Sequence, residues 1–224
     1  MDKKAYYRDA SVAAGYEAES FSAPAGRLTH EAELAVLRAS FASGDRLLEL
    51  ACGTGRLLRA LRQDGRSVAG VDQSPEMLRA GFPEGLVDLH VADVSSLPFP
   101  NASFDGAYSF RFTNHYADLR PLFKECRRVL RAGGRLVFDT MRWSPLLWDS
   151  PRWGGRNYPV GDRQVEAWLR EAGHEVEKRG SLFPVGPYIL GGLPLAAARP
   201  IMTLGSVLPH WTQAVGIWHA RKPS

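Results

Sequence analysis

The chain has 224 residues, of which 45% are hydrophobic and 23% charged, with a formal net charge of +4. A chain of this length buries a sizeable core without disulfides, and these fractions exclude disordered and collagen-like proteins. Its two cysteines, Cys52 and Cys126, are too few for a disulfide framework or a four-cysteine metal site. The charged N-terminus lacks the apolar core of a secretory signal, so we expect a cytoplasmic protein.

Short apolar runs alternate with amphipathic helical stretches, which predicts an α/β domain with a largely parallel sheet. The first helix is expected to begin after Thr29, with Glu31 and Glu33 in its first turn. Strands are expected over 46–51, 67–72, 86–91, 104–110, 135–140, 174–183 and 212–222. Further helices are expected over 55–64, from Pro75 with Ser74 as N-cap, over 117–131 up to Gly133 and Gly134, and over 161–173 with Asp162 as N-cap.

A glycine loop directly follows the first expected strand and precedes a helix. It has the sequence ELACGTG, from Glu49 to Gly55. Open α/β sheets bind ligands at the carboxyl ends of their strands, and this turn is the usual place. The dinucleotide fingerprint fails at its third glycine, where Leu58 stands, and the Glu49 carboxylate would repel a pyrophosphate. The loop therefore favours a ligand that carries an ammonium group or another cation.

Two further acids stand at expected strand ends. Asp72 closes the second strand and has the position of a residue that binds ribose hydroxyls. Asp93, in the turn Ala92-Asp93-Val94 after the third strand, is a candidate for an exocyclic amine. A nucleoside with a positively charged tail satisfies all three acids, and the loop contains no lysine for a phosphate. The alternative is that Gly53 and Gly55 form a structural turn and that Asp72 and Asp93 are ordinary strand-end acids, but the ordered spacing argues against a joint accident.

Four motifs in order, ELACGTG, VDQSPEML, VADVSSLPFPNASFDGAYS and LFKECRRVLRAGGRLVFD, resemble the class I S-adenosylmethionine-dependent methyltransferases. The small-molecule group that includes the ubiquinone/menaquinone methyltransferases is the most similar. The resemblance implies S-adenosyl-L-methionine as cofactor and S-adenosyl-L-homocysteine as product. It places Glu49 and Gly53 at the methionine part, Asp72 at the ribose, Asp93 and Val94 at the adenine, and Ser109 or Phe110 beside the sulfonium. The other expected cofactor-binding residues are Ala51, Gly55, Gln73 and Met77.

The resemblance also implies a Rossmann-like seven-stranded sheet, mostly parallel with an antiparallel last strand, and helices on both faces. We expect one methyltransferase domain over 1–224, with a cofactor-binding core over 29–140. Residues 1–28 are expected to cover the cofactor site. Residues 141–160 and 181–210 are expected to be insertions that cover the substrate.

Candidate catalytic residues follow the fourth expected strand. Methyl transfer needs a positioned nucleophile more than elaborate acid–base machinery, because the sulfonium is already activated. His115 is the candidate general base, since an unperturbed histidine titrates near neutrality. Arg111 is the candidate for orienting an acidic substrate. Helix capping by His115 and a structural salt bridge at Arg111 are the alternatives.

Other functions find less support in the sequence. Arg56, Arg59, Arg62 and Arg66 share one helix face, which indicates a solvated surface more than a nucleic-acid site. The six histidines are scattered without ligand spacing, so no metal site is expected. The rival enzyme class is an NAD(P)-dependent oxidoreductase, against which Leu58 and Glu49 argue. A cofactor-binding regulator without turnover remains the non-enzymatic alternative.

The run from Ser181 to Ala198 contains no charge and is long enough to raise the question of a membrane span. Three prolines and a glycine pair within it argue against a spanning helix and favour a cover over the active site. Aromatic residues are expected as further walls: Tyr6, Tyr7, Tyr16, Phe21, Trp143, Trp148, Trp153 and Tyr158, together with Leu147. They indicate a hydrophobic, aromatic small-molecule acceptor, with O-methylation ahead of C- or N-methylation. The sequence gives no indication of the oligomeric state.

Overall fold

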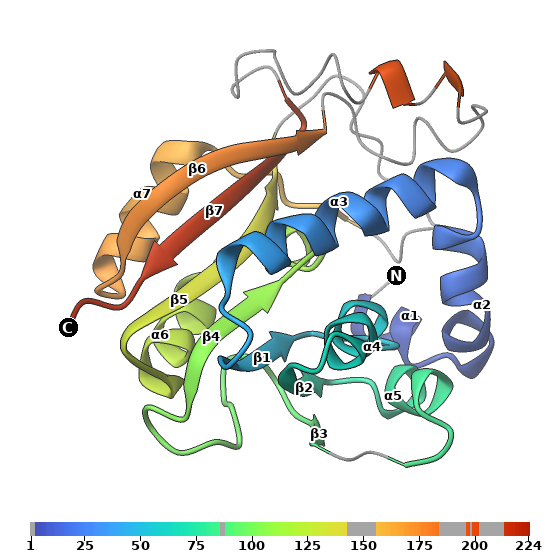
Figure 1. The fold of residues 1–224 in the computed structure, drawn as a ribbon, viewed down its shortest axis with the longest axis horizontal. Helices are drawn as coiled ribbons and strands as arrows, with labels where there is room; N and C mark the ends of the chain where they lie inside the picture. Colours follow the sequence, from blue (N-terminus) through green and yellow to red (C-terminus); the bar gives the residue numbers. More distant parts are fainter. Residues whose placement is uncertain (1–2, 86–87, 143–155, 184–195, 198, 202–212) are drawn as a thin grey trace.

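The computed structural model describes residues 3–85, 88–142, 156–183, 196–197, 199–201 and 213–224 (Figure 1). Its strands are β1 (Arg46–Leu50), β2 (Ser67–Asp72), β3 (Leu89–Val91), β4 (Phe104–Ser109), β5 (Leu130–Met141), β6 (Glu175–Phe183) and β7 (Val215–Arg221). Its helices are α1 (Lys3–Tyr7), α2 (Ala10–Phe21), α3 (Pro24–Ser40), α4 (Arg56–Gln63), α5 (Pro75–Gly81), the 3-10 turn η1 (Thr113–His115), α6 (Arg120–Val129) and α7 (Asp162–Glu171).

The seven strands form one sheet in the order β3-β2-β1-β4-β5-β7-β6. The pairs of β1 with β2 and β4, of β2 with β3 and of β4 with β5 are parallel. The last strand, β7, pairs antiparallel with both β5 and β6. The predicted seven-stranded, mostly parallel sheet with an antiparallel last strand is therefore confirmed.

Helices cover both faces of this sheet (Figure 1). Alternate residues of β1 point to opposite faces: Leu47 packs with α3 and α4, whereas Leu48 packs with α6 and α7. Strands β1, β2 and β4 are buried over nearly their whole length, as expected for parallel strands between two helical layers, whereas most of β3 and most of β6 are exposed. The carboxyl ends of β1, β2 and β4 therefore meet at one edge of the sheet.

The N-terminal helices differ from the prediction. The first long helix, α3, begins at Pro24 instead of after Thr29, because a proline in the first turn is preorganised for a helix start. Thr29 lies inside α3, where its hydroxyl donates to the carbonyl of Ala25 at 2.8 Å. Glu33, expected in the first turn, lies further along α3 and is buried. Two helices that sequence analysis did not predict, α1 and α2, precede it.

Two other predicted boundaries are wrong. Helix α6 ends at Val129, and β5 already begins at Leu130, so the pair Gly133-Gly134 lies within a strand. The pairing of β4 with β5 is irregular there, which shows that the glycines bend a strand instead of ending a helix. The N-cap of α7 is Gly161, whereas Asp162 forms an ion pair with Arg142 at 2.8 Å. By contrast, Ser74 caps α5 as predicted and accepts a hydrogen bond from the Met77 N–H.

Within the described part of the chain, no helix is both long and apolar enough to cross a membrane. Most of the charge-free run from Ser181 to Ala198 lies outside the described residues, as do Trp143, Leu147, Trp148 and Trp153. The division into a cover, a core and two insertions stays a prediction.

Candidate functional site

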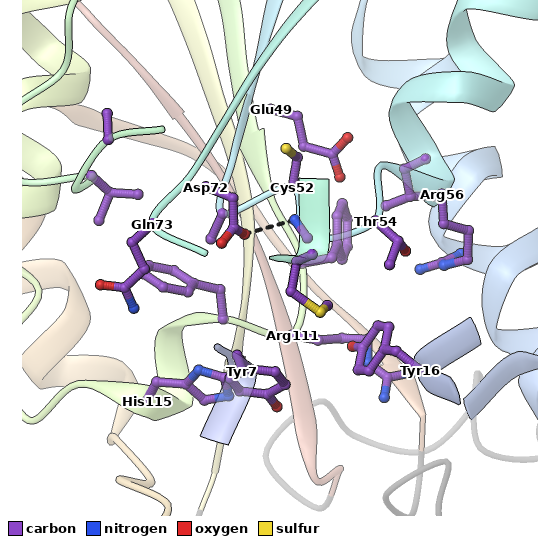
Figure 2. A pocket seen from close by; sticks show the side chains of 18 of the residues that line it. Tyr7, Tyr16, Glu49, Cys52, Thr54, Arg56, Asp72, Gln73, Arg111 and His115 are labelled. Atoms are coloured by element: carbon purple, nitrogen blue, oxygen red, sulfur yellow. Dashed lines mark hydrogen bonds between the residues drawn. The ribbon is translucent and has the colours of Figure 1, made fainter. Parts of the chain in front are cut away.

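A cavity of about 850 Å³, part of it open to solvent, lies at the carboxyl ends of β1, β2 and β4 (Figure 2). It collects ten of the thirteen predicted site residues: Glu49, Ala51, Gly53, Asp72, Gln73, Met77, Val94, Phe110, Arg111 and His115. Gly55, Asp93 and Ser109 are not among its lining residues. The remaining lining residues are Tyr7, Tyr16, Phe21, Cys52, Thr54, Arg56, Leu57, Ala92, Phe112 and Tyr116.

The glycine loop adopts left-handed backbone conformations that bring its main chain to the cavity wall. Gly53 and Gly55 have φ angles of 57° and 73°, and Ala51 has a φ of 52°. Glycine adopts such angles without strain, whereas alanine rarely does. Gly55 does not line the cavity but allows the loop to pack on Phe82, since a Cβ at Gly55 would lie 2.2 Å from that ring.

Asp72 ties this loop to the start of α5. Its carboxylate accepts hydrogen bonds from the Gly53 N–H at 2.7 Å, drawn in Figure 2, and from the Ser74 N–H at 2.8 Å. Burial raises the pKa of Asp72, and these backbone donors oppose that rise. Asp72 therefore orders the loop in addition to facing the cavity.

Glu49 is the less exposed of the two acids in the cavity wall. The residue is only 5% exposed, and the Tyr108 hydroxyl donates to its carboxylate at 3.2 Å. Burial raises the pKa of Glu49 to about 8, although the nearby charge of Arg56 opposes that rise. A ligand ammonium beside this carboxyl would favour its ionised form, so the site is suited to a cationic group.

Asp93 and Ser109, which the resemblance assigns to the adenine and the sulfonium, make hydrogen bonds within the chain. The Asp93 carboxylate accepts from the Ser95 N–H and hydroxyl at 2.9 and 2.7 Å, so it shapes the turn while Val94 lines the cavity. Ser109 is fully buried and donates its hydroxyl to the Leu50 carbonyl at 3.0 Å. This bond joins the ends of β1 and β4 and thereby fixes where Phe110 enters the wall.

The cavity wall also carries both candidate catalytic residues. His115, in η1, stacks on Tyr7 of α1 with ring centroids 5.5 Å apart and an interplanar angle of 17°. Arg111 has a φ of 63°, and its N–H donates to the buried Asp139 carboxylate at 2.8 Å. Its guanidinium lies 4.7 Å from the ring centroid of Phe21. Both candidates therefore contact the N-terminal helices.

The helices α1 and α2 form one side of the cavity. Tyr7, Tyr16 and Phe21 line it, whereas Tyr6 and Tyr158, which were also expected as walls, are not among the lining residues. The Ser74 hydroxyl donates to the Tyr7 carbonyl at 2.6 Å, so the loop after β2 holds α1 directly.

The arginines of α4, and Arg66 just after it, do not form the solvated face that the sequence indicated. Arg56 pairs with the buried Glu33 of α3, and Arg59 pairs with Glu17 of α2 at 2.6 Å. Arg62 and Arg66 donate to backbone carbonyls of neighbouring segments. Sequence analysis missed Arg56 as a lining residue, although its position directly after the glycine loop is a usable signal.

Known proteins share this domain and this fold. Residues 48–138 match the family model described as a methyltransferase domain. The chain is 34% identical over 164 residues to the O-methyltransferase cnsE of Penicillium expansum, an alignment that covers 67% of this chain and 58% of that protein. Three curated relatives are covered over only 33%, 58% and 45% of their own lengths, so the chain spans one third to three fifths of them.

Solved structures extend the likeness across the chain. The putative methyltransferase in complex with the Trm112 activator of Haloferax volcanii superposes with a TM-score of 0.69 at 22% identity, over 100% of this chain and 98% of that one. A SAM-dependent methyltransferase of Thermotoga maritima gives 0.65 at 20% identity, over 88% and 90%. The predicted resemblance is confirmed: residues 48–138 belong to the methyltransferase domain family, and the chain has the fold of the S-adenosylmethionine-dependent methyltransferases.

Proposed function

We propose that the chain is an S-adenosylmethionine-dependent methyltransferase that methylates a hydrophobic, aromatic small molecule. The observation that carries this proposal is the cavity in which Glu49 and Asp72 lie on adjacent strand ends beside the glycine loop. Glu49 would hold the methionine ammonium, Asp72 the ribose hydroxyls, and Ala92 and Val94 would flank the adenine. Two buried carboxyls in the wall disfavour a pyrophosphate, which argues against a dinucleotide.

The acceptor class is inferred from the aromatic residues of the cavity wall. Six lining residues are aromatic, namely Tyr7, Tyr16, Phe21, Phe110, Phe112 and Tyr116. Aromatic walls with few polar groups are typical of sites for apolar ligands. O-methylation is favoured over C- or N-methylation because the relative from Penicillium expansum is an O-methyltransferase.

Methyl transfer requires few catalytic groups from the protein. The cofactor, when bound, supplies a methyl group attached to a sulfonium, and the sulfur leaves as a neutral thioether once the methyl is transferred. The residues of the chain align the acceptor oxygen behind that methyl and exclude water. For a phenolic acceptor, His115 would take the hydroxyl proton as the new O–C bond forms.

Asp72→Ala is expected to weaken S-adenosylhomocysteine binding about 100-fold, since a ribose contact and two charge-assisted hydrogen bonds are lost. Calorimetric titration measures this affinity. Asp72→Ala is expected to weaken the binding of 5′-methylthioadenosine by the same factor, because that ligand keeps the ribose. Asp118→Ala, which removes an exposed partner of Arg120, is the control. Failure of the wild-type protein to bind S-adenosylhomocysteine would refute the proposed function.

His115→Ala is expected to lower turnover about 100-fold or more while leaving cofactor affinity unchanged, because a general base contributes at least that much. The measurement is transfer of labelled methyl to a panel of phenols. His115→Phe separates the roles, since phenylalanine can still stack on Tyr7 but takes no proton. If His115→Phe restores turnover, His115 only supports Tyr7. His90→Ala, on the edge strand β3, is the control.

A further inference from the structure

The buried hydroxyl of Ser74 makes two hydrogen bonds with different roles. Ser74 is 1% exposed and lies two positions after Asp72, whose carboxylate accepts the Ser74 N–H at 2.8 Å. The hydroxyl oxygen accepts from the Met77 N–H at 3.1 Å and so caps α5. The hydroxyl proton is donated to the Tyr7 carbonyl at 2.6 Å, a shorter contact than the 3.3 Å to the Glu76 carboxylate. Because an N-cap needs only the oxygen, the donated bond serves a second purpose.

The donated bond fixes the end of α1. Tyr7 is the last residue of this helix, and the final carbonyls of a helix have no partner within it. The next two N–H groups of the chain donate to the carbonyls of the residues before Tyr7. The Ser74 hydroxyl therefore supplies a donor that α1 itself does not, and a carbonyl that loses its donor inside a protein is unfavourable.

The ring of Tyr7 is the surface on which the imidazole of His115 rests. Figure 2 shows the two rings next to each other, stacked with centroids 5.5 Å apart and an interplanar angle of 17°. Tyr6 and Tyr16 meet the Tyr7 ring in T-shaped arrangements at 5.1 and 6.1 Å. Phe112 meets the imidazole in the same way at 5.9 Å. Since Tyr7 and His115 both line the cavity, the place of Tyr7 sets part of its wall.

From these contacts we infer that Ser74 is a positioning residue for methyl transfer, which holds Tyr7 and, through the stacked rings, His115. The inference rests on the proposed function, in which Asp72 holds the ribose and His115 takes the acceptor proton. The short segment 72–74 then sets the place of both. Because a misplacement of about 1 Å costs up to about 100-fold in rate, the hydroxyl of Ser74 matters more for turnover than for cofactor binding.

NMR of the free protein tests whether Ser74 holds Tyr7 against His115. The ring current of Tyr7 shifts the signals of the stacked imidazole protons upfield, and His115→Gln identifies these signals among the six histidines. Tyr7→Leu removes the ring but keeps the carbonyl, so it gives the change for complete loss of the stack. Ser74→Gly is expected to produce most of that change. The double variant is expected to show no more than Tyr7→Leu alone.

Two substitutions of Ser74 separate its bond to Tyr7 from its capping of α5. Glycine and alanine both lack the donor, but glycine keeps most of the stability of an N-cap and alanine does not. We therefore expect Ser74→Gly and Ser74→Ala to change the His115 signals equally, and Ser74→Thr, which keeps the hydroxyl, to restore them. Ser103→Ala is the control, since it removes a hydroxyl bond to the Pro100 carbonyl outside the cavity lining and should change nothing.

Turnover measures the consequence for the reaction. With a phenol that the wild-type protein methylates, Ser74→Gly is expected to lower kcat about tenfold or more. The affinity for S-adenosylhomocysteine is expected to fall less than about threefold, because the Asp72 carboxylate and the Ser74 N–H remain. Ser74→Thr is expected to recover most of kcat.

Three results would overturn the inference. The first is that Ser74→Gly leaves the His115 signals in place. The second is that only Ser74→Ala moves them, which would assign Ser74 to capping alone. The third is that the signals move and kcat stays unchanged. Absence of S-adenosylhomocysteine binding to the wild-type protein would instead refute the proposed function, and the signals of the free protein would be read independently of it.

Discussion

Glu49→Gln is expected to weaken S-adenosylhomocysteine binding about 30-fold or more while making the free protein more stable at pH 8. Removing one partner of a buried charge pair costs roughly 2–5 kcal/mol of binding, which sets the size of the first effect. The second effect follows from burial, because Glu49 is 5% exposed and ionises in the free protein without a ligand cation beside it. Glu49, which serves ligand binding, thus lowers the stability of the free protein.

The sign of the stability effect follows from the pKa of Glu49, which burial raises from 4.5 to about 8. Between about pH 4.5 and pH 8 the folded protein keeps the proton of Glu49, whereas the unfolded chain has already released it. Stability due to this residue therefore falls as the pH rises through that window. Glutamine removes the dependence, so we expect a gain of about 1–3 kcal/mol at pH 8 and none at pH 4.

Cofactor affinity is expected to change with pH in the opposite direction. The ammonium binds the ionised carboxylate, so binding releases the proton of Glu49. The affinity of the wild-type protein for S-adenosylhomocysteine should rise towards pH 8 by up to about tenfold per pH unit. Glu49→Gln should flatten this rise. It should leave the affinity for 5′-methylthioadenosine unchanged, because that ligand lacks the ammonium.

Chemical denaturation and calorimetry across pH 5–8 measure both effects. Glu33→Gln is the matched control, because Glu33 is also a buried glutamate beside Arg56 but lies outside the cavity wall. Its loss breaks a buried ion pair and is expected to lower stability at pH 8. If Glu49→Gln also lowered stability and kept full S-adenosylhomocysteine affinity, Glu49 would be a structural residue and the placement of the ammonium would be wrong.

Sequence signals that act over a few residues predicted the core of the site. The apolar run of β2 ends at Asp72, and Ser74-Pro75 starts α5 with the expected cap. Because parallel strands end at one edge of a sheet, local motifs at the ends of β1 and β2 sufficed to bring Glu49 and Asp72 to one cavity. Their roles toward a ligand stay predictions.

Contacts between distant segments explain what the sequence did not predict. The solvated-face interpretation of α4 failed because Arg56 and Arg59 meet Glu33 and Glu17, which lie 23 and 42 residues earlier in the chain. The hydrogen bond from the Arg111 N–H to the Asp139 carboxylate joins residues that lie 28 positions apart, so no local sequence pattern predicts it. The Asp93 carboxylate accepts a hydrogen bond from the Ser95 N–H two residues on, and the role of Asp93 toward the adenine stays a prediction.

Gly81→Ala is expected to lower the free energy of unfolding by about 3 kcal/mol, an effect at the upper end for overpacking. Gly81 ends α5, where alanine is intrinsically favoured by about 1 kcal/mol. A Cβ at this position, however, would lie 1.9 Å from the carbonyl oxygen of Thr54 and 2.5 Å from its carbonyl carbon. Since the obstacle is backbone, no side chain can rotate away, and α5 must separate from the glycine loop.

The same displacement is expected to weaken S-adenosylhomocysteine binding, because Thr54 and Gly53 line the cavity and Arg59 bridges the carbonyls of Thr54 and Gly81. Gly44→Ala is the control, since a Cβ there meets nothing within 4 Å. Denaturant unfolding and calorimetry of both variants measure the two losses together. A Gly81→Ala protein of unchanged stability would mean that α5 and the loop are not in contact, and the cavity built between them would then have to be redrawn.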